Sequence, residues 1–150
     1  MKKTTALICI AVLLVILFSA CRTSKKIELS KPQTNISSIE IIHIHSGSAK
    51  ALETGYWEVP FEYDLLNTIP EARWNIFMGE LRGIEWYERL LQGEPPAVGG
   101  DAVKINYNDG SCETICCMAS ESYKDGESTL NYIACDEKVF ESFIEKYAEK

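Results

Sequence analysis

The chain has two histidines, and they are only two positions apart, at His43 and His45. If this segment is a β-strand, both side chains point to the same face, with about 6–7 Å between their Cα atoms. The pair supplies two metal ligands, whereas a zinc site needs a third and usually a fourth. The spacing of the cysteines that could complete the set, Cys112, Cys116, Cys117 and Cys135, matches no preset ligand pair. We therefore favour strand histidines without a metal and keep a metal- or thiol-handling role as the alternative.

No other group of residues forms a recognisable catalytic set. A serine, cysteine or threonine nucleophile needs an adjacent base, and the sequence has no Gly-x-Ser-x-Gly motif. Gly99 and Gly100 are not followed by the Lys-Ser/Thr pair of a phosphate-binding loop. Carboxylate pairs such as Glu62 and Asp64 are unremarkable among 22 acidic residues, because most carboxylates are solvated surface groups. We therefore expect no enzyme activity and no cofactor.

An aromatic segment at residues 56–63 is a candidate partner surface. Trp57, Phe61 and Tyr63 alternate with polar residues around Pro60, and proline limits a strand to the edge of a sheet. Exposed Trp and Tyr side chains are typical of binding surfaces. The alternative, which we favour, is that these rings cover the sheet edge and belong to the core.

The N-terminus has the pattern of a secretory signal. Lys2 and Lys3 precede an uncharged stretch that contains an unbroken apolar run at residues 6–18, as in the first two regions of a signal peptide. As a helix, thirteen residues rise only about 20 Å, which is short for a hydrocarbon layer of about 30 Å. The sequence therefore predicts a signal peptide at residues 1–20 that is cleaved rather than kept as a membrane span.

The end of this segment reads Leu17-Phe18-Ser19-Ala20-Cys21, which resembles the lipobox of bacterial lipoproteins, although Phe18 stands where leucine is usual. The resemblance implies that a diacylglycerol is attached to the Cys21 thiol and that signal peptidase II cuts before it. Two or more acyl chains hold a protein on a bilayer without a spanning helix. The implied location is the extracytoplasmic face of the cell membrane. An ordinary signal peptide, with Cys21 incidental, is the alternative.

The mature chain divides into a short polar segment and one domain. Residues 21–35 are rich in Lys, Ser, Pro and Gln, which is typical of a flexible tether. Residues 36–150 are enough for a single globular domain. Cleavage removes two lysines and leaves 13 basic against 22 acidic residues, a net charge of −9. We therefore expect no nucleic-acid partner.

Hydrophobic periodicity places the expected elements. Two segments have apolar residues at helical spacing: Pro70 begins one that ends at Gly83, and Asp136 caps the other. The remaining apolar runs alternate as strands do. In chain order the elements are a strand at 39–45, an edge strand or extended loop within 47–67, a helix at 70–83, strands at 84–91, 103–107, 112–118 and 128–135, and a helix from 136.

Two Asp-Gly pairs, at 109–110 and 125–126, mark hairpin turns. If both turns have two residues, Cys112 and Cys116 share the face of Val103, Ile105 and Tyr107, and Cys116 lies opposite Cys135. Opposed residues on antiparallel strands are within disulfide range, so Cys116 and Cys135 are the candidate disulfide. A one-residue bulge would bring Cys117 into register instead. The alternative, which we favour, is that all four cysteines stay reduced.

These elements predict an α+β fold, with an antiparallel sheet of about four to five strands and two amphipathic helices on one face. The pattern, with its Lys-Ile-Asn-Tyr-Asn-Asp-Gly hairpin and closing Phe-Ile-Glu-Lys-Tyr helix, is similar to small uncharacterised lipoproteins of gram-positive bacteria. That resemblance implies no activity. The expected role is a non-enzymatic module on the membrane that binds a protein, peptide or envelope component.

Overall fold

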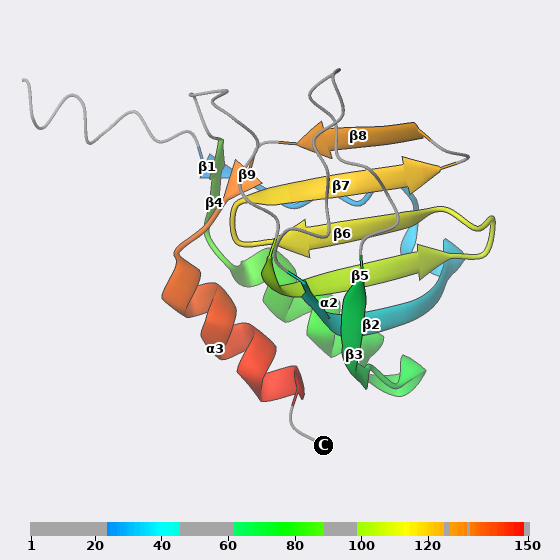
Figure 1. The fold of residues 1–150 in the computed structure, drawn as a ribbon, viewed down its shortest axis with the longest axis horizontal. Helices are drawn as coiled ribbons and strands as arrows, with labels where there is room; N and C mark the ends of the chain where they lie inside the picture. The colour runs from blue at the N-terminus through cyan, green and yellow to red at the C-terminus, as the bar shows by residue number, and fades with distance from the viewer. Residues whose placement is uncertain (1–23, 46–61, 89–98, 125–126, 132, 149–150) are drawn as a thin grey trace, which may run out of the picture.

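Six antiparallel strands form the larger of two sheets, in the spatial order β3-β2-β5-β6-β7-β8 (Figure 1). The computed structural model describes residues 24–45, 62–88, 99–124, 127–131 and 133–148. The strands are β2 (Ile36–Ile44), β3 (Tyr63–Thr68), β5 (Gly100–Tyr107), β6 (Cys112–Cys116), β7 (Ala119–Lys124) and β8 (Glu127–Asn131). The segment containing Trp57 and Phe61 lies outside the described residues, as do residues 1–23.

Three short strands form the smaller sheet, in the order β1-β4-β9. They are β1 (Ser24–Lys25), β4 (Trp86–Glu88) and β9 (Ile133–Ala134). The strand predicted at 84–91 is thus present as β4, and its Trp86 is fully buried. The helical elements are η1 (Gln33–Asn35), η2 (Glu71–Arg73), α2 (Trp74–Gly83) and α3 (Glu137–Ala148).

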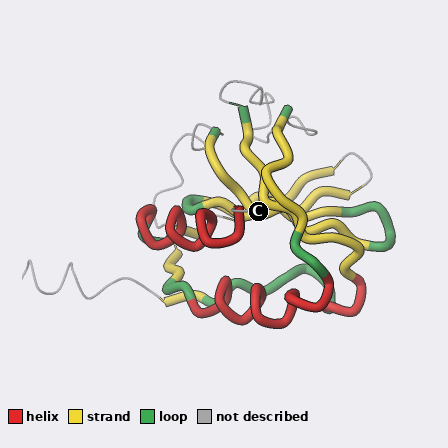
Figure 2. Tube along the Cα trace, turned by 90° about the horizontal axis from the view of Figure 1, so that it is seen from below, coloured by secondary structure: helices red, strands yellow, loops and turns green. Residues whose placement is uncertain are grey.

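Both long helices cover one face of the larger sheet, and Figure 2 shows them on the same side of the strands. Helix α2 buries Phe77, Met78 and Leu81, the apolar positions expected from its periodicity. The ring of Phe77 lies 4.7 Å from that of Tyr147 on α3, in an edge-to-face arrangement. The predicted α+β fold is confirmed. The larger sheet contains one strand that was not expected, β7 at residues 119–124, and the strand predicted at 84–91 belongs to the smaller sheet.

The loop of the first hairpin begins one residue earlier than predicted and has three residues instead of two. Asn106 pairs with Cys112, so three residues, 108–110, form the loop between Tyr107 and Ser111. Gly110 has a φ of 81°, and the Tyr107 N–H donates to the Ser111 carbonyl at 2.9 Å. A three-residue loop with its last residue left-handed is the next most common hairpin after the two-residue forms.

This one-residue shift reverses the faces of β6, because side chains alternate along a strand. Cys112 and Cys116 therefore lie on the face opposite Val103, Ile105 and Tyr107, and the prediction that they share that face is wrong. Glu113 and Ile115 take the core-facing positions, opposite Ile105 and Val103. Glu113 is only 4% exposed, so the shift also buries a carboxylate.

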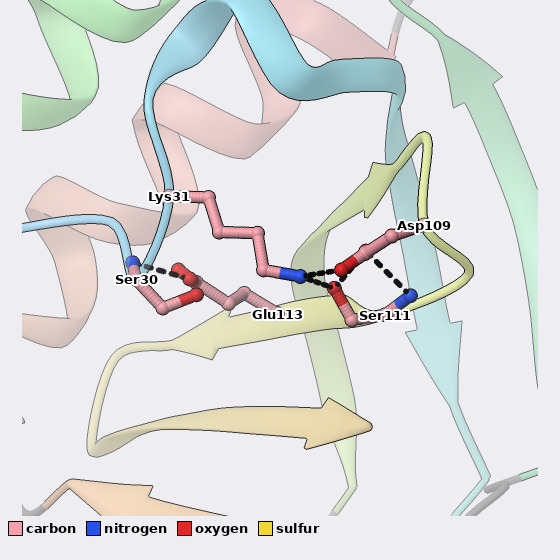
Figure 3. Close-up of polar contacts among 5 residues, drawn as sticks. All are labelled: Ser30, Lys31, Asp109, Ser111 and Glu113. Carbon is pink, nitrogen blue, oxygen red and sulfur yellow. Dashed lines mark hydrogen bonds and ion pairs between the residues drawn. The ribbon is translucent and has the colours of Figure 1, made fainter. Parts of the chain in front are cut away.

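Residues 24–35 belong to the fold, and their prediction as a flexible tether is wrong for this described part. Strand β1 pairs with β4, and Ile27 is 5% exposed within the main core. A cluster that we call the N-terminal clamp then fixes the segment to the first hairpin (Figure 3). It consists of Ser30, Lys31, Asp109, Ser111 and Glu113.

The N-terminal clamp has two parts. The Ser30 N–H donates to the Glu113 carboxylate at 2.5 Å, and the Lys31 ammonium contacts both Asp109 and the Ser111 hydroxyl. Hydrogen bonds from Lys31 and then from Ser111 hold the pKa of Asp109 far below its usual range. A polar composition therefore does not mean a free chain, because the partners of these groups are about 80 residues away.

Candidate functional site

The two histidines lie at the end of β2, each bonded to a carboxylate on a neighbouring strand. His43 lies opposite both Asp101 and Asp64 in the strand register. Its Nδ1 is 2.6 Å from Asp101, while His45 Nε2 is 2.9 Å from Asp64. The imidazole rings are 6.4 Å apart, and both side chains are nearly half exposed.

This arrangement does not assemble the ligand set that the metal hypothesis needs. Each imidazole contacts an aspartate rather than a thiol. Cys116 packs beside Ile42 and Ala102 on the opposite face of the sheet. Among the residues that the structure describes, no three His, Cys, Asp or Glu side chains are placed to hold a metal ion.

Tyr63, from the predicted partner surface, is the first residue of the edge strand β3. Its hydroxyl accepts a hydrogen bond from the Lys104 ammonium at 2.6 Å. The same ammonium lies 4.4 Å from the centre of the Tyr63 ring, and Tyr63 packs against Ile42 and Ile44. Tyr63 thus packs against the smaller core cluster. Because Trp57 and Phe61 lie outside the described residues, the choice between core and partner surface stays a prediction.

The cysteines are arranged differently from the predicted pairing. The Asp125-Gly126 turn has the expected register, since Tyr123 pairs with Ser128. However, a tight turn at Cys117 and Met118 separates β6 from β7, and Cys116 lies opposite Ala119. The predicted register of Cys116 against Cys135 is therefore wrong, because a second hairpin intervenes. No disulfide joins the four described cysteines in this structure.

Cys117 is the residue that lies next to Cys135. The Cys135 N–H donates to the Cys117 carbonyl at 2.9 Å. Cys135 belongs to the main core cluster, and Cys117 packs against it. Burial, and then the neighbouring cysteines, raise the pKa of the Cys135 thiol to about 12. Burial likewise raises the pKa of the Cys117 thiol to about 11. Both thiols are therefore protonated at neutral pH and are weak nucleophiles.

These two cysteines form part of the wall of a pocket of about 590 Å³, which we call the thiol pocket. It lies where the smaller sheet, the β6–β7 turn and the start of α3 meet, and Figure 1 shows β1, β4 and β9 side by side near the first turn of α3. It is lined by Ser24, Ile84, Glu85, Tyr87, Cys117, Met118, Ala134, Cys135, Asp136, Glu137 and Val139.

The thiol pocket combines exposed apolar groups with carboxylates. Met118 is 41% exposed and Val139 is 50% exposed. Two of the acidic side chains, Glu85 and Glu137, are also exposed. Asp136 instead caps α3, since its carboxylate accepts hydrogen bonds from two backbone N–H groups of the first turn. Such a surface favours a ligand with an apolar part and a positive charge.

Sequence reasoning missed this pocket, because its walls come from four separate segments of the chain. One local signal was present. Val139 is one of the apolar residues at helical spacing in α3, but it is exposed at the pocket while Phe140 and Phe143 are buried. An apolar residue at the margin of a helix face, next to acidic residues at the helix start, indicates a surface that is not fully covered.

No described helix is long and apolar enough to cross a membrane. Comparison of the chain with protein-family models, with curated proteins and with solved structures finds no match. The assignment of a role therefore depends on the residues and on the geometry described above.

Proposed function

We propose that this chain is an exported lipoprotein, anchored through Cys21 to the outer face of the cell membrane, and that it acts as a non-enzymatic binding module. We further propose that the thiol pocket is its ligand site. The partner is a protein, peptide or other envelope component with a basic and partly apolar contact group.

The position of the pocket carries this proposal. Ser24 lines it, and Ser24 is three positions after Cys21. Three residues span at most about 10 Å, so a lipid on Cys21 keeps the pocket close to the bilayer surface. Because β1 is paired with β4, the anchor is joined to an ordered part of the domain. This connection favours a fixed position of the pocket relative to the membrane.

The charge of the chain supports the proposed ligand class. The mature chain has a net charge of −9, and exposed carboxylates of Glu85 and Glu137 lie at the pocket. Surface charge of one sign steers ligands of the opposite sign toward a site. Exposed Met118 and Val139 supply apolar area beside these charges. The raised pKa values of the two thiols favour binding over thiol catalysis at this pocket.

Replacement of Cys21 with serine tests the anchor. We expect Cys21→Ser to abolish membrane association, because the variant loses the thiol to which the acyl chains are attached. The measurement is cell fractionation with detection of the domain, and a Cys112→Ser chain is the matched control that keeps its anchor. A cleaved, unlipidated Cys21→Ser product that stays in the membrane fraction would contradict the proposal.

Site-specific photocrosslinking tests the pocket. A benzophenone amino acid at position 139, in intact cells, is expected to give a discrete adduct, because this side chain lies at the pocket and is half exposed. Ile76 is the control, since it is 59% exposed on α2 and does not line the pocket. We expect Glu85→Gln with Glu137→Gln to reduce the adduct several-fold. Equal yields at positions 76 and 139, or no effect of charge removal, would overturn the assignment.

A further inference from the structure

Cys117 and Cys135 come from two segments that are held together by a backbone hydrogen bond. The 2.9 Å bond between the Cys135 N–H and the Cys117 carbonyl brings the two backbones together like those of neighbouring strands, in which facing Cα atoms lie about 4.5–5.5 Å apart. Disulfides form at Cα separations of about 4.4–6.8 Å. Both residues line the thiol pocket, and Cys117 packs against the core cluster that contains Cys135.

The other two described cysteines are placed differently, although Cys116 is near enough to contribute to the raised pKa of both thiols. Cys116 follows the alternation of β6 to the opposite face of the sheet, where it packs near Ala102. Cys112 is four positions further along β6, which is about 13 Å in an extended strand. Of the described cysteines, Cys117 is thus the one placed to bond with Cys135.

We propose that Cys117 and Cys135 form a disulfide bond in the exported protein. This inference rests on the export that is part of the proposed function, because disulfides form and persist outside the reducing cytosol. The bond closes a covalent ring around residues 118–134, which include β7, β8 and β9. It joins the β6–β7 turn to the residue before the cap of α3 and thereby fixes two walls of the thiol pocket.

The oxidant in this proposal is the disulfide of an extracytoplasmic thiol oxidoreductase. The Cys117 thiol is the more exposed of the two, so it loses its proton and attacks the oxidant first, forming a mixed disulfide. The Cys135 thiol then loses its proton and displaces the oxidant, which leaves with both electrons as a dithiol. One sulfur–sulfur bond forms, two S–H bonds break, and the oxidant disulfide is reduced.

Counting free thiols after denaturing alkylation tests the pairing. The chain has six cysteines, of which Cys9 is removed with the signal peptide and Cys21 is blocked by lipid. We therefore expect two alkylated thiols in the exported wild-type chain, from Cys112 and Cys116. The Cys116→Ser variant should have one, and the Cys117→Ser and Cys135→Ser variants should each have three. Mass spectrometry of the non-reduced digest should show the segment at 117 joined to that at 135.

Other thiol counts would contradict the proposed pairing or show that export has failed. Four alkylated thiols in a cleaved, lipidated wild-type chain would overturn the disulfide while leaving export intact. Six in an uncleaved chain would show instead that export fails. Three thiols in Cys116→Ser and one in Cys117→Ser would assign the bond to Cys116, against the structure. If the disulfide is present, a reductant should lower the melting temperature of the wild type. It should not change that of Cys117→Ser or Cys117→Ala, because these variants lack the bond.

Discussion

Replacing Phe140 with alanine is expected to destabilise the domain by about 3–5 kcal/mol, the usual cost of removing a buried aromatic side chain. Phe140 is 2% exposed on the inner face of α3. Its ring lies 5.9 Å from that of Trp86, edge to face, and 6.2 Å from that of Phe143. Small domains have a total stability of about 5–15 kcal/mol, so this single change removes a large part of it.

The measurement is urea unfolding followed by tryptophan fluorescence, to which the buried Trp86 contributes. Val139→Ala is the matched control, because the neighbouring Val139 is 50% exposed and surface changes usually alter stability by less than about 0.5 kcal/mol. Truncation before Asp136 removes all four buried residues of α3 and should leave an unfolded chain. Equal midpoints for Phe140→Ala and Val139→Ala would contradict the packing.

Helices α2 and α3 could be predicted because their signals are local. The apolar spacing of each helix, the proline before α2 and the aspartate before α3 lie within a few residues of the element that they specify. The second Asp-Gly turn was predictable for the same reason, and its register is as expected. Together with the alternating strand at β2, these local signals were sufficient for the fold class.

The register of the first hairpin could not be obtained in this way. Asp-Gly fits both a two-residue loop and the last positions of a three-residue loop, and the difference is decided by how the hairpin packs. The structure uses the longer loop, which places Glu113 and Ile115 toward the core. Apolar Ile115 inside and Cys116 on the other face agree with this choice. The sequence pattern did not favour it, because it also buries a carboxylate.

The contacts of residues 24–35 could not be predicted from the sequence for a related reason. Three lysines, two serines and a proline read as a solvated linker, but their partners are on β4 and on the first hairpin. The thiol pocket could not be predicted for the same reason. Cys117 and Cys135 are brought together only when β7 and β8 form a hairpin between them. Pairings between segments far apart in the chain leave no periodic pattern.

The second large loss of stability is expected when Glu113, a residue of the N-terminal clamp, is replaced. Its carboxylate accepts the Ser30 N–H at 2.5 Å and is 4% exposed. In Glu113→Ala the Ser30 N–H loses its acceptor and a space opens beneath the N-terminal segment. A partly buried donor without a partner costs about 1–3 kcal/mol. Glu113→Gln keeps an oxygen acceptor at the same position, so it should lose clearly less stability than the alanine variant.

The destabilisation should be concentrated in the segment that the clamp holds. The side chains of Lys25 and Lys26 are exposed in the folded chain, but a protease must also bind the backbone, which is held by β1 and the N-terminal clamp. Cleavage of such a segment therefore follows the population of its open state. We therefore expect trypsin to cut Glu113→Ala after Lys25 and Lys26 at least several-fold faster than it cuts the wild type, with Glu113→Gln in between. If all three proteins were cut at one rate, residues 24–35 would not be held by Glu113, and their attachment would have to depend on Ile27 and the β1–β4 pairing.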